Sequence, residues 1–217
     1  MEQEIVVRGS GEVRALPDEA TLRVEITADH TQLEAAYQAR AAVAARVDAV
    51  LAGHADAIAR SVVAALGVQP RSRWHKGQDV RTGWRAFRTT LVDVRGLDAL
   101  GGLMAGLVEA GAAVTGPRWS LAPDNPAHDA AREGAAADAR RRAEAYARAL
   151  GLTLGPVAWV AEPGLRLAGS SPPAPGAPVR LQAMVAAGGA AAAEPAEDLT
   201  PGELTLAASV EVGFRLG

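Results

Sequence analysis

Residues 7–20 read VRGSGEVRALPDEA, with two glycines around a serine and a Pro-Asp pair before an alternating apolar segment. A dinucleotide-binding loop would need a third glycine at position 14 and a helix directly behind it, because the phosphate binds at the helix N-terminus. Arg14 stands there instead, and Pro17-Asp18 leads into a predicted strand. The stretch therefore predicts a connection or bulge between two strands, where Gly9 and Gly11 permit close backbone approach.

Composition indicates a globular chain. Of the 217 residues, 49% are hydrophobic and 22% are charged, which is enough apolar surface for a sizeable core. The net charge of −3 gives no global attraction to nucleic acid or anionic lipid. The absence of cysteine excludes disulfides, thiolate metal sites and a cysteine nucleophile. The acidic N-terminus does not resemble an export signal and no apolar run reaches the ~18 residues of a membrane span, so we expect a cytoplasmic protein.

The N-terminal part alternates and then changes to a helical pattern. We expect strands at 3–8 and around Leu22, Val24 and Ile26, which stand at every second position. Thr31-Gln32-Leu33-Glu34 has the form of a capping box, so we expect a helix from there to about residue 51, closed by Gly53.

Residues 56–75 are compatible with either helix or strand. The alanines favour a helix, whereas Val62, Ala64, Leu66 and Val68 alternate and Pro70 favours an extended residue before it. Residues 76–83 are typical of a turn, and 84–95 of a strand.

The remainder alternates between helical and strand patterns. We expect a helix at 97–110, a strand at 112–121, a helix from about 126 to 150 and a strand at 152–161. The inward stripe of the long helix is predicted to be Ala139, Ala143, Tyr146, Ala147 and Leu150, and the run at 140–142 a solvated face. Residues 164–199 are rich in proline, glycine and alanine and are expected to form an excursion without a core. Residues 204–216 alternate most regularly and predict a strand in the main sheet.

No motif nominates a catalytic, cofactor or metal site. His128 lies near Asp124, Asp129 and Glu133, but these acids are better explained as complements to the start of a helix. No H-E-x-x-H or G-x-S-x-G spacing occurs. We therefore expect no catalytic residues, no cofactor and no metal.

The predicted hairpin end is rich in arginine and tryptophan. Residues 71–88 carry six basic side chains against the single acid Asp79, with aromatic residues between them. Tryptophan and arginine are favoured anchors of protein interfaces, and such a surface also suits single-stranded nucleic acid. The remaining alternative is a solvated strand face that binds no partner. The candidate interface residues are Arg73, Trp74, Arg81, Trp84 and Arg85.

The order of these signals resembles the SIMPL-domain family. The resemblance rests on Val7, Gly9, Gly11, Val13, Pro17, Asp18 and Ala20 near the start, VQP at 68–70, GWRA at 83–86, LGLTLGPVAWVAEPG at 150–164 and PGELTLAASVEVGFRL at 201–216. It implies that 58–74 is a strand of a central hairpin. The family that the chain resembles includes bacterial members linked to defence against oxidative stress, a periplasmic member that forms a ring-like oligomer, and an animal member that takes part in kinase signalling. It carries over no catalytic residue.

We expect an α+β fold of mainly antiparallel sheet with helices on one face, in two interlocked lobes. One lobe would comprise 1–82 with 200–217 and the other 83–163. The leading functional hypothesis is a non-enzymatic, homo-oligomeric scaffold or interaction module in a stress response, with an unidentified protein as a further partner. The alternative is a module that binds small molecules or single-stranded nucleic acid through the basic aromatic hairpin 71–88, with nucleic acid the less favoured partner.

Overall fold

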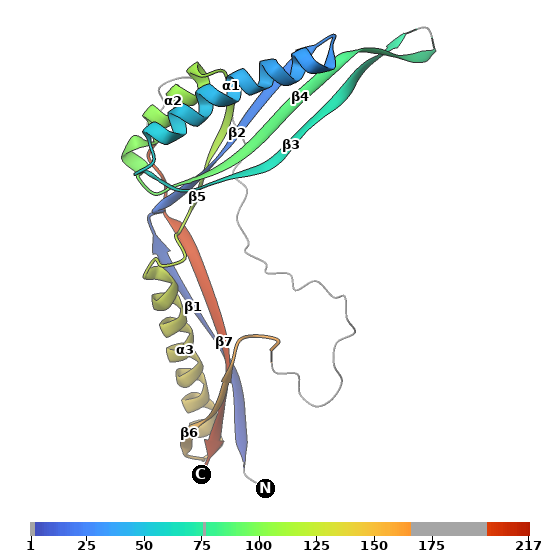
Figure 1. The fold of residues 1–217 in the computed structure, drawn as a ribbon. Helices are drawn as coiled ribbons and strands as arrows, with labels where there is room; N and C mark the ends of the chain where they lie inside the picture. Colours follow the sequence, from blue (N-terminus) through green and yellow to red (C-terminus); the bar gives the residue numbers. More distant parts are fainter. Residues whose placement is uncertain (1–2, 76, 166–198) are drawn as a thin grey trace. The chain divides into compact units, whose positions relative to one another are not determined.

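The computed structural model describes residues 3–75, 77–165 and 199–217. The fold is α+β with mainly antiparallel sheet, as predicted. In chain order the elements are β1 (Glu4–Ala15), β2 (Glu19–His30), α1 (Leu33–Gly53), β3 (Ile58–His75), β4 (Gln78–Val94), the 3-10 turn η1 (Leu97–Ala99), α2 (Leu100–Glu109), β5 (Ala113–Ser120), α3 (Ala127–Ala149), β6 (Leu154–Ala161) and β7 (Leu204–Leu216) (Figure 1). Within these described ranges no helix is long and apolar enough to cross a membrane.

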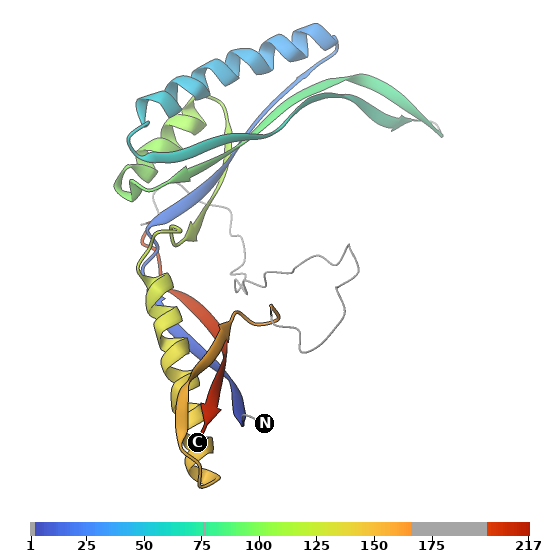
Figure 2. The same cartoon turned by 60° about the horizontal axis from the view of Figure 1, so that its bottom comes forward.

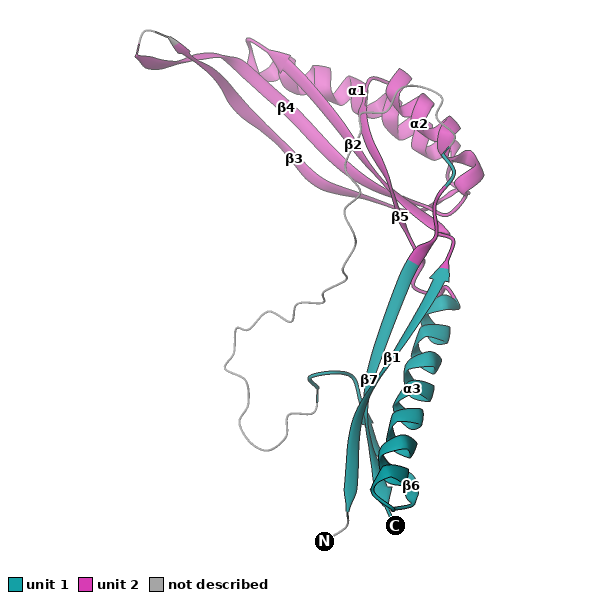
Figure 3. Ribbon diagram, turned by 180° about the vertical axis from the view of Figure 1, so that it is seen from behind, with its two compact units in different colours: residues 1–14, 126–200, 205–217 teal, residues 15–125, 201–204 magenta. Residues whose placement is uncertain are grey.

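The chain divides into two compact units, which Figure 3 colours separately. Unit 1 comprises Met1–Arg14, Pro126–Thr200 and Thr205–Gly217, and unit 2 comprises Ala15–Asn125 and Pro201–Leu204. These units differ from the expected lobes 1–82 with 200–217 and 83–163. The expected boundary at residue 83 falls inside β4, which pairs with β3 along nearly its whole length. Most of the expected excursion at 164–199 lies outside the described residues.

Unit 2 is a four-stranded antiparallel sheet with two helices on one face. The strand order is β3-β4-β2-β5, and the chain order β2-α1-β3-β4-α2-β5 makes this a split βαβ arrangement. Alternating apolar residues of β2 and β4, Leu22, Val24 and Val92 among them, are fully buried beneath the leucines of α2 and the inner face of α1. α1 and α2 lie on the same side of the sheet (Figure 1). The opposite face carries the polar residues of β2 from Thr21 to Asp29, together with apolar residues of β4 such as Phe87 and Leu91.

Unit 1 is a three-stranded sheet in the order β1-β7-β6, with α3 packed along it (Figure 2). Every fourth residue of α3 from Ala127 to Ala147 is a buried alanine. Tyr146 and Leu150, expected in the same stripe, are 58% and 66% exposed, because the stripe follows a four-residue spacing that leaves them on its flank. The arginines at 140–142 lie on the solvated face, as predicted.

Gly9, Ser10 and Gly11 lie inside β1 and do not join two strands. A Cβ atom on either glycine would overlap the α3 backbone, at Ala135 for Gly9 and at Ala131 for Gly11. The prediction of close backbone approach is confirmed, and that of a strand connection is wrong. Ser10 N–H donates to the Asp138 carboxylate at 3.0 Å, so the amide that a phosphate would use faces an acid. The actual connection is residues 16–18.

Two local predictions about the following elements need correction. α1 begins at Leu33, and no side chain among the described residues caps it; the N–H of Gln32 donates to His30 Nδ1 at 3.1 Å, so the predicted Thr31 capping box does not form. The predicted turn at 76–83 is much shorter, because β4 already begins at Gln78. Residues 58–75 form the strand that the family resemblance implied.

Candidate functional site

The β3–β4 hairpin extends past the rest of its sheet (Figures 1 and 2). β2 pairs with β4 only as far as His30, which is opposite Trp84. Beyond this row β4 has β3 as its only strand partner among the described residues, through Arg73↔Val80 and Trp74↔Asp79. This two-stranded end, together with Trp84 in the last row that reaches β2, is residues 71–84 of the hairpin and is called the hairpin end below. The sequence therefore places its arginines and tryptophans where side chains on both faces reach solvent.

The two tryptophans of the hairpin end differ in exposure and in their neighbours. Trp74 is 72% exposed, which is unusual for so large an apolar side chain. Trp84 is half-buried, and the Arg81 guanidinium lies 5.2 Å from its ring centroid, a cation–π contact. Arg73 makes no ion pair within the described part of the chain. Arg73, Trp74, Arg81 and Trp84 therefore present two cations and two aromatic surfaces.

Arg85 has a different environment from the other candidate residues. Its Nε and Nη2 donate to the two carboxylate oxygens of Asp29, both at 2.8 Å, and Arg71 reaches the same carboxylate at 2.9 Å. The hydrogen bond from Arg85, with the charges of both arginines, holds the pKa of Asp29 below its usual value. Asp29 thus joins β2 to both strands of the hairpin, and its charge offsets one of these two arginines. Sequence reasoning did not identify this acid.

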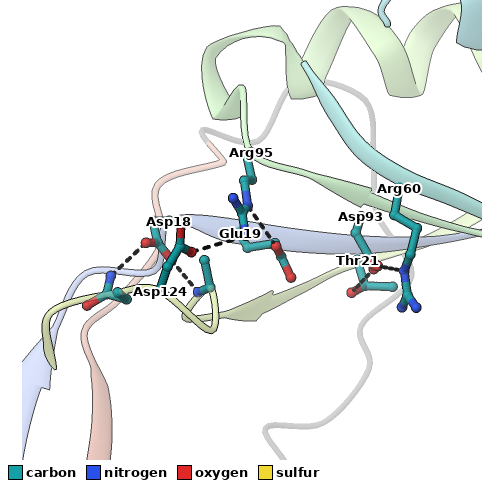
Figure 4. A network of polar contacts seen from close by, with 9 residues as sticks. Asp18, Glu19, Thr21, Arg60, Asp93, Arg95 and Asp124 are labelled. Carbon is teal, nitrogen blue, oxygen red and sulfur yellow. Dashed lines mark hydrogen bonds and ion pairs between the residues drawn. The ribbon is translucent and has the colours of Figure 1, made fainter. Parts of the chain in front are cut away.

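A second polar cluster surrounds Asp18, in the connection between β1 and β2 (Figure 4). The Asp18 carboxylate accepts hydrogen bonds from Ala122 N–H at 2.7 Å and from the Asn125 amide at 2.6 Å. Burial alone would raise the pKa of Asp18, but these hydrogen bonds and the charge of Arg95 outweigh it and lower the pKa. The cluster ties the β1–β2 connection to the segment after β5. The Pro17-Asp18 pair of the family pattern was the available signal for it.

Arg95 and Asp93 extend the polar contacts at the end of β4 (Figure 4). Arg95 bridges Glu19 at 3.2 Å and Asp124 at 3.1 Å. Asp93 is buried and accepts from Thr21 and from Arg60, both at 2.8 Å. Each carboxylate of this region is therefore engaged by protein donors, which favours a structural role for the cluster.

The described residues contain no group of three or more side chains placed to hold a metal ion. Of the acids around His128, Asp124 pairs with Arg95 and Asp129 with Arg132.

Arg40 of α1 is a separate feature. It is buried against Tyr37, with its guanidinium carbon 4.8 Å from the ring centroid. Its Nε has no hydrogen-bond partner within the described ranges.

Comparison with known proteins agrees with the motif pattern. Residues 5–214 match the SIMPL family model, described as a protein of unknown function (DUF541). The chain is 32% identical over 163 residues to the uncharacterized protein YggE of Edwardsiella ictaluri, covering 70% of this chain and 65% of that protein. It is 31% identical over 157 residues to YggE of Escherichia coli strain K12, covering 70% and 63%.

The chain thus spans slightly less than two thirds of the length of these YggE relatives. The family match, in contrast, covers nearly all of this chain, from the second residue of β1 to Phe214 in β7. On this match the chain belongs to the SIMPL family.

Proposed function

We propose that this SIMPL-family protein acts as an interaction module, without catalysis, and self-associates through its β3–β4 hairpin. The observation that carries the proposal is the edge strand β3. It is 18 residues long and, among the described residues, pairs on only one side, with β4. Residues 61–69 contain no charge, and Val62, Val63 and Leu66 within them are 44%, 48% and 60% exposed.

The unpaired backbone groups of an edge strand can bind a further strand. Soluble monomers prevent this pairing with charged side chains, prolines or bulges in the edge strand. In β3 the charges and the proline lie outside this run, at Arg60, Pro70, Arg71 and Arg73. One register shift occurs between Val63 and Ala65, but residues 65–71 keep a regular register with residues 83–89. Apart from this shift, the uncharged run offers regularly paired backbone to a further strand, and a second copy of the same edge is the partner that we propose.

The hairpin end adds side-chain anchors next to the strand edge. Trp74, Arg73 and Arg81 are residue types that contribute most binding energy at protein interfaces. An exposed tryptophan at the end of a two-stranded arm would bury a large apolar area on association. The proposal therefore assigns affinity to the tryptophans and strand pairing to β3.

Size-exclusion chromatography with light scattering tests this proposal. We expect a mass above that of one chain, and partial dissociation in Trp74→Ala and Trp84→Ala. Tyr146→Ala is the matched control, because it removes an aromatic side chain that is 58% exposed in unit 1. A single-chain mass at every concentration, or unchanged assembly in both tryptophan variants, would refute the proposal.

The second candidate function is binding of single-stranded nucleic acid by the hairpin end. The exposed Trp74 ring and the Arg81–Trp84 contact favour it, whereas the Asp29 carboxylate offsets part of the basic charge of Arg71 and Arg85. It predicts affinity that falls with salt and with Arg73→Ala and Arg81→Ala. No binding of an oligothymidine at low salt would exclude it.

A role in the response to oxidative stress rests on the family resemblance alone. It predicts that cells without the protein grow more slowly under peroxide and that the wild-type chain restores growth. Equal growth of the two strains would refute it.

A further inference from the structure

The face of the unit 2 sheet opposite α1 and α2 carries an ordered array of side chains. The strand registers place Thr27, Phe87 and Gly67 in one row across β2, β4 and β3. The neighbouring row on one side contains Glu25, Thr89 and Ala65, and that on the other contains Asp29, Arg85 and Gln69. An aromatic ring therefore lies at the centre of a polar surface that neither helix covers.

Phe87 has a defined position in this array. A Cβ atom on Gly67 would lie 2.8 Å from Phe87 Cζ, so the ring lies over the glycine and rests against the β3 backbone. Small neighbours leave a hollow beside it of about 310 Å³, lined by Arg23, Glu25, Gln69, Arg85, Phe87 and Thr89 among others. This volume is at the lower end of small-molecule sites and fits one or two sugar rings.

The charges around the hollow are paired. Arg23 contacts Glu25 at 2.7 Å, and Arg85 contacts Asp29 through two hydrogen bonds of 2.8 Å. A phosphate or carboxylate bound here would be attracted by the arginines and repelled by the neighbouring acids. The net electrostatic contribution to anion affinity is therefore small. A hydroxyl group both donates and accepts, and therefore suits a surface on which carboxylate acceptors and guanidinium donors lie side by side.

We propose that this open face binds a neutral carbohydrate of one or two units. The C–H face of a sugar ring would pack on Phe87, and its hydroxyls would bond to the Arg23–Glu25 pair and to Gln69. Aromatic packing supplies the apolar contact and the paired charges set the orientation. The inference goes beyond the proposed function and is tested separately, because the sugar would contact side chains on one face of the sheet, whereas self-association is assigned to the backbone edge of β3 and to the hairpin end.

Titration of the isotope-labelled full chain with chitobiose, cellobiose and maltose, followed by NMR, tests the site. At about 10 mM sugar, which is above the ~1 mM Kd of a weak site, at least one disaccharide should shift the amide signals of residues 25, 27, 69 and 87. Phe87→Leu keeps apolar bulk without the ring, and Gln69→Ala alters only an exposed side chain. Each should weaken binding at least several-fold.

Tyr37→Ala is the control, because it removes a half-exposed aromatic from α1, on the covered side of the sheet. It should leave the sugar affinity unchanged. The absence of shifts with all three sugars would overturn the proposal, and so would binding that both site variants retain.

Discussion

Gly9 of β1 lies directly against Ala135 of α3, and a Cβ atom on the glycine would overlap the Ala135 carbonyl oxygen and come within 2.5 Å of the Ala139 nitrogen. Only glycine therefore lets this strand and helix approach so closely. Gly9→Ala should lower the free energy of unfolding by about 1–3 kcal/mol, the usual cost of overpacking. Urea unfolding followed by circular dichroism measures it.

Ser10→Ala is the matched control for this prediction, because Ser10 lies between the two glycines and its side chain is exposed. It should change the free energy of unfolding by less than about 0.5 kcal/mol. Equal stability of Gly9→Ala and the wild type would show that β1 and α3 are not packed as described.

Asp18 should make the stability of the fold depend on pH. Its pKa in the folded chain is lowered, so its contribution is present above the unfolded pKa of about 3.9 and is lost as the pH falls through the folded value. Asp18→Asn removes the charge and places an amide N–H group against the donors of Ala122 and Asn125, which should cost about 1–3 kcal/mol at pH 7.

Urea midpoints of the wild type and Asp18→Asn, measured between pH 7 and pH 3, test this. The gap between the two proteins should narrow as the pH falls below about 4, because Asp18 takes up a proton in the unfolded chain before it does so in the folded one. Asp29 and Asp138, whose pKa values are also lowered, are unchanged in the variant and cancel in the comparison. A gap independent of pH would contradict the role given to Asp18.

Asp29→Ala should loosen the hairpin without unfolding the chain. It removes the carboxylate that holds Arg71 and Arg85, and exposed ion pairs contribute only about 0.2–1 kcal/mol to stability. Amide hydrogen exchange of residues 69, 71, 84 and 85 should accelerate. Glu25→Ala breaks the Arg23 pair on the same strand and should leave exchange there unchanged.

The β3–β4 hairpin was predicted in part from the sequence. Alternation in 56–75 was masked by alanines that also suit a helix, and the family pattern of VQP and GWRA resolved it in favour of the strand now seen as β3. The length of β4 was underestimated because Gly83 and the polar residues before it are typical of a turn. Pairing with β3 overrides that local preference.

The site residues illustrate a second limit. Arg85 and Arg71 looked equivalent to Arg73 in the sequence, but only the strand register brings Asp29 next to the first two. The Asp18 cluster joins residues more than 100 positions apart, so no local pattern could reveal its partners. The contact between Phe87 and Gly67 could not be read from a local pattern either, because these residues become neighbours only when β3 pairs with β4.

Sedimentation velocity of the wild type, Val63→Lys and Val108→Lys tests the central claim most directly. Both valines are about half exposed, but Val63 lies in the uncharged run of β3 and Val108 on α2. A lysine on an edge strand opposes strand addition. The account predicts assembly of the wild type and of Val108→Lys and a single-chain mass for Val63→Lys. A single-chain wild type, or a Val63→Lys variant that assembles like the wild type, would contradict it.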